Sequence, residues 1–258
     1  MAQHCPPGCG HLHFSALKAL ARSPAHYKYA SEHGTVTTPA MAVGSAVHAL
    51  VLEHGDGIVR FDGSRRGKEW LAFQDAHADQ TILTATEYER AVQMAGAVTS
   101  HPRAAELLVG VHELPIYWKI GERDCMGRLD SIRPDGSIVE LKTAADASPR
   151  GFQRAAERLN YCAQLSFYAD GQRAANPTGP SADEAFVIAV ESAPPYVVQT
   201  FRVPANTLDL GRRTYRLWLE MLAVCTASGE WPGYQESDVI LDLPEDVELQ
   251  IGDELIEV

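Results

Sequence analysis

Asp130, Glu140 and Lys142 lie close together in a stretch of the chain that is rich in β-forming residues. A Pro-Asp-Gly turn at 134–136 returns the chain on itself and brings Asp130 to about the level of Glu140. Residues two apart in a strand share a face, so Glu140 and Lys142 project together. Two neighbouring carboxylates are costly unless a cation neutralises them, and their oxygens suit Mg²⁺ or Mn²⁺. The pattern therefore predicts a hydrolytic metal site.

Lys142 fits such a site because an ammonium group can orient a water molecule or offset charge on a phosphoryl oxygen. The simpler interpretation is that Glu140 and Lys142 form a cross-strand ion pair on a solvated face. Short patterns of this kind are common, so the three residues alone do not decide between the two.

A helix is predicted from Ser148 to about Asp170, because Ser-Pro at 148–149 is a typical helix start. Its helical spacing places two tyrosines and a glutamine on one stripe with three arginines beside them. These residues are Arg150, Arg154, Arg158, Tyr161, Gln164 and Tyr168. They suit contacts with phosphates and stacked bases, although an ordinary amphipathic helix with half-buried tyrosines has the same pattern.

The elements that must position these residues follow from hydrophobic periodicity. Helices are predicted over 15–22, 40–52, 86–99, 102–109, 148–170 and 208–228. Strands are predicted over 114–120, 124–132, 137–142, 185–191 and 196–203, and a long loop over 54–78. This order predicts an α/β fold in which a mixed central sheet is flanked by helices.

The length of 258 residues indicates one large domain with appendages. The formal net charge is −12, and nine of the 34 acids lie in 236–258, which contains no Lys or Arg. We expect a flexible N-terminus at 1–12, a folded domain at 13–235 and an acidic C-terminal segment at 236–258. The rest of the chain is nearly balanced in charge. The acidic net charge therefore does not exclude a local basic groove that binds nucleic acid.

A second group of metal-ligand residue types lies near the start of the chain. It consists of His4, Cys5, Cys9, His11 and His13. These residues are either a zinc site or part of an ordinary flexible terminus.

The ordered motifs resemble the PD-(D/E)xK nuclease superfamily. Asp130, Glu140-x-Lys142 and Gln164-x-x-x-Tyr168 resemble its RecB-like branch with the QxxxY helix, and GSAVH at 44–48 resembles the histidine motif of that branch. Further segments are similar to exonuclease VIII-type phage recombination exonucleases over about 13–235. They are SALK at 15–18, SPAHY at 23–27, GSAVHALVLE at 44–53, HP at 101–102, ELPIYW at 113–118 and GEWPGY at 229–234.

The resemblance implies a restriction-endonuclease-like core and a role for each matched residue. His48, Asp130 and Glu140 would be ligands of Mg²⁺, with Mn²⁺ able to substitute, and Lys142 would be the catalytic lysine. Taken alone, His48 on an apolar helix reads as a core histidine. Glu113 would support the ligands or act as a conditional ligand, and Gln164 and Tyr168 would support the site or touch DNA. DNA contacts are expected from Arg128, Arg150, Arg154, Arg158 and Tyr161.

The resemblance also implies an activity: metal-dependent degradation of linear double-stranded DNA from the 5′ end. The remaining 3′ strand would pass to a single-strand annealing protein in recombination. A homo-oligomer is expected, and some members of the family form rings around the duplex. A single-strand-specific exonuclease of the CRISPR-associated kind and a non-catalytic DNA-end-binding protein are the alternatives. No stretch approaches the ~20 apolar residues of a membrane span and no secretory signal is visible, so we expect a cytoplasmic protein of a bacterium or phage-infected cell.

Overall fold

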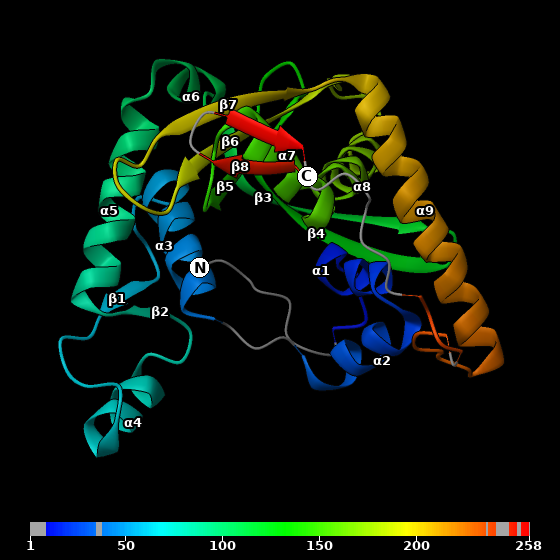
Figure 1. The fold of residues 1–258 in the computed structure, drawn as a ribbon, viewed down its shortest axis with the longest axis horizontal. Coiled ribbons are helices and arrows are strands. Elements are labelled where there is room, and N and C mark those ends of the chain that lie inside the picture. Colours follow the sequence, from blue (N-terminus) through cyan, green and yellow to red (C-terminus); the bar gives the residue numbers. More distant parts are fainter. Residues whose placement is uncertain (1–8, 35–37, 236, 241–247, 252–253, 258) are drawn as a thin grey trace.

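A five-stranded sheet lies at the centre of the computed structural model, which describes residues 9–34, 38–235, 237–240, 248–251 and 254–257. The strands follow the order β3-β4-β5-β6-β7 (Figure 1). Their bounds are β3 (Val111–Ile120), β4 (Arg123–Ile132), β5 (Ile138–Ala144), β6 (Ala185–Glu191) and β7 (Val198–Val203). Only β5 and β6 run parallel; the other neighbouring pairs are antiparallel. The predicted mixed sheet is confirmed.

Helices cover both faces of this sheet, because alternate residues of the buried strands point to opposite sides. On β6, Val187 and Ala189 belong to one core cluster, whereas Phe186 and Ile188 belong to the other. The first cluster packs under α1 (Phe14–Leu17), α8 (Tyr161–Ala175) and α9 (Ala205–Ser228). The second packs under α3 (Pro39–Leu52), α5 (Ala85–Ser100) and α6 (Pro102–Leu107).

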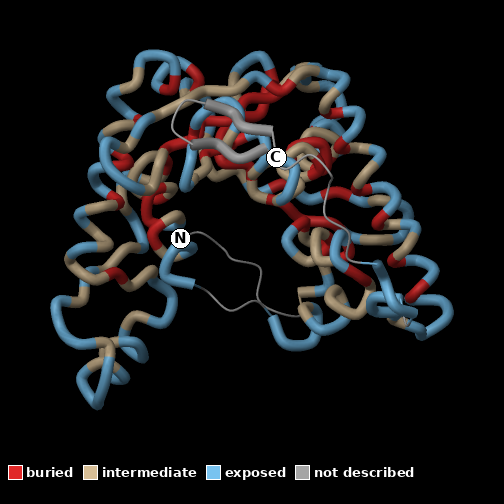
Figure 2. Tube along the Cα trace, in the orientation of Figure 1, coloured by how far each residue is buried: buried red, intermediate tan, exposed pale blue. Residues whose placement is uncertain are grey.

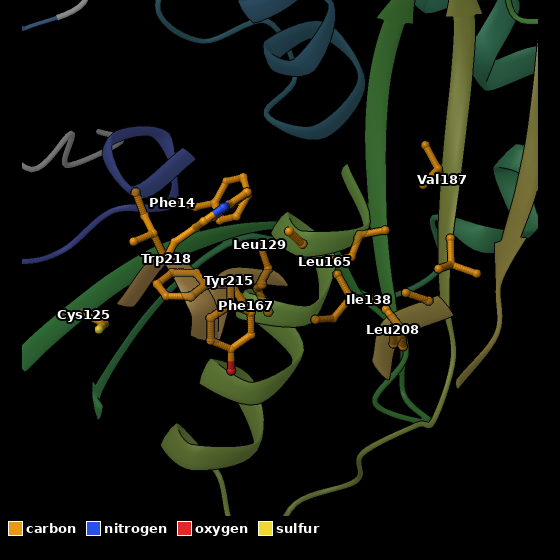
Figure 3. Packing of buried hydrophobic residues seen from close by; sticks show 14 of the residues in the cluster. Phe14, Cys125, Leu129, Ile138, Leu165, Phe167, Val187, Leu208, Tyr215 and Trp218 are labelled. Atoms are coloured by element: carbon orange, nitrogen blue, oxygen red, sulfur yellow. The ribbon is translucent and has the colours of Figure 1, made fainter. Parts of the chain in front are cut away.

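Within the first cluster, the aromatic rings of Phe14, Phe167, Tyr215 and Trp218 lie together (Figure 3). Phe167 of α8 makes edge-on contacts with Trp118 and Tyr215, with centroid distances of 4.8 and 5.5 Å. Phe14 of α1 lies 5.9 Å from the same ring. Helix α8, which carries the predicted Gln164 and Tyr168, is thereby fixed against β3, α1 and α9.

Two groups of elements extend from the sheet on opposite sides in Figure 1. One contains α3, α5 and α4 (Gly67–Ala76), and the other contains α1, the 3₁₀ turn η1 (Lys18–Ala21), α2 (Pro24–His33) and α9. Buried residues gather in the sheet and the helices against it, whereas the α4 end is mostly exposed (Figure 2). A further hairpin is formed by β8 (Glu248–Ile251) and β9 (Glu254–Glu257).

Two sequence-based expectations about elements are wrong. The loop predicted over 54–78 contains β1 (Ile58–Arg60) and α4, and β1 pairs in parallel with β2 (Thr81–Leu83). Helix α2 was also not predicted. Three-residue strands are too short to show a period, and the charged side chains of α4 obscure its apolar face of Trp70, Leu71 and Phe73.

The long helix predicted from Ser148 to Asp170 is two helices. Asn160 adopts the left-handed conformation (φ 58°, ψ 40°) and separates α7 (Pro149–Leu159) from α8. Asparagine tolerates this conformation better than most residues, so it can end a helix without glycine. Tyr161, Gln164 and Tyr168 share α8, as predicted. The prediction that the three arginines lie beside them on the same helix is wrong, because the arginines are on α7.

Helices α8 and α9 approach so closely that Gly211 of α9 has no room for a side chain. A Cβ atom there would overlap the carbonyl oxygen of Cys162 and lie 2.5 Å from the Ser166 hydroxyl oxygen. That hydroxyl oxygen already lies 2.7 Å from the carbonyl oxygens of both Cys162 and Leu208. The close packing of α8 against α9 therefore requires a residue without a Cβ atom at position 211.

Gly211→Ala is expected to lower the free energy of unfolding by about 1–3 kcal/mol, because overpacking forces the helices apart. Urea unfolding followed by circular dichroism measures this change. Gly96→Ala on α5 is the matched control, since a Cβ atom there meets nothing within 4 Å. Alanine is favoured over glycine in an exposed helix, so this variant should be as stable as the parent or more stable. Equal effects of the two substitutions would contradict the close-packing argument.

Among the described helices, none combines the length and the apolar character that a membrane crossing requires.

Candidate metal centre and active site

Three side chains from three elements converge at one point of the molecule. Nδ1 of His48, on α3, lies 3.5 Å from Oδ1 of Asp130 and 4.0 Å from Oε1 of Glu113. Each of the three residues offers one ligand atom, and these atoms lie within 4.8 Å of one another. The imidazole is 25% exposed, so His48 lies at the edge of the core and not inside it.

Helix α3 holds His48 over the sheet. It starts at Thr38, whose side chain accepts a hydrogen bond from the amide of Met41 at 3.2 Å, and Pro39 occupies the first helical position. Val43 and Val47 are buried against the sheet and fix the rotation of the helix. This rotation places the His48 imidazole next to Asp130.

Glu113 reaches the cluster through an unusual backbone conformation. Its φ of 50° is left-handed, although it lies within β3. His112 pairs with Ser131 and Leu114 with Leu129, so Glu113 lies opposite Asp130 across the two strands. A non-glycine residue in this conformation costs on the order of 1–3 kcal/mol and is typical of functional sites. Glu113 therefore belongs to the cluster itself and does not merely support it from outside.

Asp130 and Glu140 lie where β4 and β5 separate. The two strands pair only at Ser131 with Val139 and at Ile132 with Ile138, and continuing this register puts Asp130 opposite Glu140. Beyond that point Oδ2 of Asp130 accepts a hydrogen bond from the amide of Leu141 at 2.8 Å. The carboxylate of Asp130 thus replaces a strand contact, which orients its other oxygen toward His48.

Glu140, Lys142 and Gln164 form a second, adjoining group. The Lys142 ammonium donates to Oε1 of Glu140 at 2.6 Å, and Nε2 of Gln164 donates to the same oxygen at 2.9 Å. Lys142 also donates to Oε1 of Gln164 at 3.2 Å, and its ammonium lies 5.0 Å from the centre of the Tyr161 ring. The side chains of Glu140 and Lys142 are only 4% and 18% exposed, so they do not form a solvated surface pair.

Burial and crowding of charge set the pKa values in the site. Burial raises the pKa of Glu113 to about 7, and burial followed by the charge of Asp130 raises that of Glu140. Burial opposes ionisation of Asp130 as well, but His48 and Lys142 lower its pKa below the ordinary value. Burial would lower the pKa of His48 and Lys142, yet the neighbouring carboxylates raise both. Burial thus opposes the charged form of each of these groups, while the opposite charges beside them favour it.

The donors present fit a divalent cation. Oε2 of Glu140 is buried and has no hydrogen-bond partner among the residues that the structure describes. An unpaired buried carboxylate oxygen is costly, and a cation would satisfy it. Glu140 is not one of the three residues whose ligand atoms lie within 4.8 Å of one another, which are His48, Glu113 and Asp130. The two carboxylates and the imidazole of that group are donors that suit Mg²⁺ and Mn²⁺, and Glu140 adds a further carboxylate beside them.

The remaining predicted residues lie at different distances from this centre. Arg128 is turned toward acids, with its Nε 2.7 Å from Glu113 and its Nη1 3.9 Å from Glu53. Tyr168 is half-buried against Gly127, where a Cβ atom would come within 2.8 Å of its ring. The three arginines predicted to contact DNA, Arg150, Arg154 and Arg158, are exposed on α7.

The sequence did not single out Glu53 or Lys18. Glu53 is the residue directly after α3, and its carboxylate lies 3.9 Å from Nη1 of Arg128. The pKa of Lys18 on η1 is lowered, first by burial and then by the positive charge of Lys142. In the N-terminal group, Sγ of Cys9 lies 3.3 Å from Nε2 of His13, and His4 and Cys5 lie outside the described residues.

Comparison with solved structures supports the fold. One solved structure is the crystal structure of a protein from Eubacterium rectale whose description gives exonuclease as an inferred activity. Its TM-score against this chain is 0.65 and its sequence identity is 15%. The match covers 91% of this chain and 90% of that chain. At this identity the likeness shows the fold alone. The crystal structure of SSO0001 matches 74% of this chain and 82% of that chain with 12% identity, and its TM-score of 0.28 carries no argument.

Comparison of the sequence gives the family. No curated protein matches the chain significantly. A family model described as a PDDEXK-like domain of unknown function (DUF3799) matches residues 13–241, a range that includes every residue of the candidate site. The resemblance to the PD-(D/E)xK superfamily is thereby confirmed, and the chain belongs to this PDDEXK-like family.

Proposed function

We propose that this chain is a metal-dependent DNA exonuclease, a hydrolase of phosphodiester bonds that degrades linear double-stranded DNA from the 5′ end. The observation that carries the proposal is the convergence of His48, Glu113 and Asp130 beside the buried pair of Glu140 and Lys142. Family membership and the fold shared with the Eubacterium rectale protein support it.

His48, Asp130 and Glu140 would hold Mg²⁺ or Mn²⁺, with Glu113 as a further ligand. A divalent ion held there supplies a water of lowered pKa and stabilises charge on the phosphate. Lys142 presents an ammonium donor at the same point, fixed by Glu140 and Gln164, and so can orient a water or a phosphoryl oxygen. Gln164 and Tyr168 hold this arrangement from α8.

DNA is the proposed substrate because three exposed arginines lie on the helix that follows the strand of Glu140 and Lys142. Arg150, Arg154 and Arg158 follow β5 on the exposed side of α7, and no ion pair of theirs occurs among the described residues. Arg128 and Tyr161 lie closer to the centre. Guanidinium groups bind phosphate oxygens and fix the register of a duplex without reading its sequence.

The biological setting of the proposal follows the resemblance of the sequence. We infer that the remaining 3′ strand is passed to a single-strand annealing protein during recombination in a bacterial or phage-infected cytoplasm. We also infer a homo-oligomer, for which a ring is one form that the resemblance offers. The nuclease domain would comprise 13–235, with the acidic segment 236–258 kept away from DNA by its charge.

Removal of metal is the first test. A linear duplex labelled at either the 5′ or the 3′ end should release nucleotides in Mg²⁺ or Mn²⁺ and none in EDTA. Early release of the 5′ label, with slow loss of the 3′ label, is the expected order. Release from single strands only would point to a single-strand-specific exonuclease. Binding of DNA ends without release in either metal would reject the proposal.

A further inference from the structure

Two sequence motifs that the catalytic site does not use lie together in the structure. The segment 23–27 begins α2, and the segment 229–234 follows α9, about two hundred residues later. The ring of Tyr27 stacks on Trp231 with a centroid distance of 5.7 Å and an interplanar angle of 12°. A backbone hydrogen bond of 3.0 Å also joins the two segments. They therefore form one surface unit.

This unit carries an aromatic patch that we define as His26, Tyr29, His33 and Tyr234. The rings of Tyr29 and His33 stack at 4.2 Å with an interplanar angle of 14°. Tyr29 is 64% exposed and Tyr234 is 71% exposed. His26, Tyr29 and His33 share one side of α2 by helical spacing, and the ring of Tyr234 lies 5.7 Å from that of His26, so Tyr29 and Tyr234 border the same surface. Rings exposed to this extent contribute little to the core and are available for binding.

A cation, Lys28, directly precedes Tyr29 of the patch. The Lys28 ammonium lies 5.6 Å from the centre of the Trp231 ring and 3.0 Å from the Glu32 carboxylate. Both members of the Lys28–Glu32 pair are about half exposed, and exposed pairs of this kind contribute little to stability. Lys28 can therefore exchange its carboxylate partner for a phosphate at little cost. Stacking rings combined with a nearby cation suit a strand with unpaired bases.

The patch is connected to the catalytic site through the segment that precedes α2. Phe14 of α1 contacts Tyr168 with a centroid distance of 6.3 Å, and Lys18 of η1 lies within electrostatic reach of Lys142. In Figure 1, α2 lies on the opposite side of the molecule from α3, which carries His48. The N-terminal segment thus runs from the catalytic site to the patch.

We propose that the aromatic patch binds unpaired nucleotides of the DNA substrate by stacking of bases on Tyr29 and Tyr234, with Lys28 at a phosphate. This inference rests on the proposed nuclease function and adds a site for single-stranded DNA outside the metal centre. Duplex DNA keeps its bases stacked within the helix, so the patch should discriminate in favour of single strands.

The test is binding of fluorescent DNA in EDTA, where no cleavage is expected. The probes are an oligothymidylate of about 16 nucleotides and a blunt duplex of similar length. The double variant Tyr29→Ala/Tyr234→Ala should bind the single strand at least about fivefold more weakly, since each stacked base contributes to affinity. Its affinity for the duplex should change by less than about twofold, because its bases are not free to stack.

Two control variants separate stacking from other effects. Tyr29→Phe/Tyr234→Phe keeps the rings and should bind like the parent, whereas a loss equal to that of the alanine variant would overturn the stacking proposal. Tyr117→Ala removes a tyrosine that is 51% exposed on β3, outside the patch, and should leave single-strand affinity unchanged. Thermal unfolding shows whether each variant remains folded.

The two proposals can fail separately. Normal single-strand binding by the alanine double variant would overturn the patch, even if the parent protein cleaves DNA in Mg²⁺. Equal losses on single strand and duplex would overturn it too. A parent protein that binds single strands through the patch but releases no nucleotides in Mg²⁺ would instead reject the nuclease function and leave the patch in place.

Discussion

Asp130→Asn is expected to reduce metal-dependent cleavage by about a thousandfold or more, because a divalent ion contributes several kcal/mol to transition-state stabilisation. The Asp130 carboxylate faces His48 at 3.5 Å and is held by the Leu141 amide at 2.8 Å. Asparagine keeps an oxygen that can accept from Leu141 but removes the charge that would hold the ion. The expected loss is therefore in metal binding and rate, with the fold retained.

Initial rates on end-labelled DNA, measured across a range of Mg²⁺ concentrations, test this expectation. Asp124→Asn is the matched control, because Asp124 lies on the same strand but is exposed and paired with Lys119. The control should cleave like the parent. A rate for Asp130→Asn within tenfold of the parent at moderate Mg²⁺ would remove Asp130 from the metal site.

Lys142→Met is expected to reduce cleavage by about 10²–10³-fold while DNA binding persists, since one preorganised donor is lost and the phosphate contacts elsewhere remain. Methionine fills the space of the lysine stem. Glu140 keeps the hydrogen bond from Gln164 at 2.9 Å but loses the ammonium group at 2.6 Å. Breaking a buried pair in this way costs up to about 3–5 kcal/mol, so a lower melting temperature should accompany the loss of activity.

A second substitution separates stability from chemistry. Lys142→Met/Glu140→Gln removes both charges of the pair and should regain much of the lost stability without regaining activity. Lys119→Met, at an exposed lysine, is the control and should change neither property. Cleavage at the parent rate by Lys142→Met, in protein shown by circular dichroism to be folded, would exclude the lysine from the mechanism.

The sequence predicted the structure correctly in segments where hydrophobic period and turn signals agree. The sequence predicted strands over 124–132 and 137–142 and a turn between them, which would place Asp130 opposite Glu140. The observed pairing of Ser131 with Val139, continued by one residue, places them there. Helix α3 was predicted to within a residue, because Pro39 marks its start and its apolar run is unbroken by charge. In these segments the hydrophobic period and the helix start signals indicate the same structure.

Other features depend on tertiary contacts that no local pattern carries. The left-handed backbone at Glu113 places its carboxylate in the cluster, and an ordinary strand pattern gives no sign of it. The break at Asn160 separates the arginines of α7 from Gln164, although the helical spacing continues across it. The proximity of Lys18 to Lys142 arises from packing of α1 and η1 against α8 and α9, far away in sequence.

Anomalous X-ray diffraction from crystals grown with Mn²⁺ tests the metal centre most directly. The expected result is a peak within coordination distance of His48 and Asp130, shared with Glu140 or Glu113, which is lost in Asp130→Asn. A protein that cleaves DNA in Mn²⁺ but shows no peak among these side chains, or a peak only elsewhere, would contradict the assignment of this cluster as the catalytic metal site.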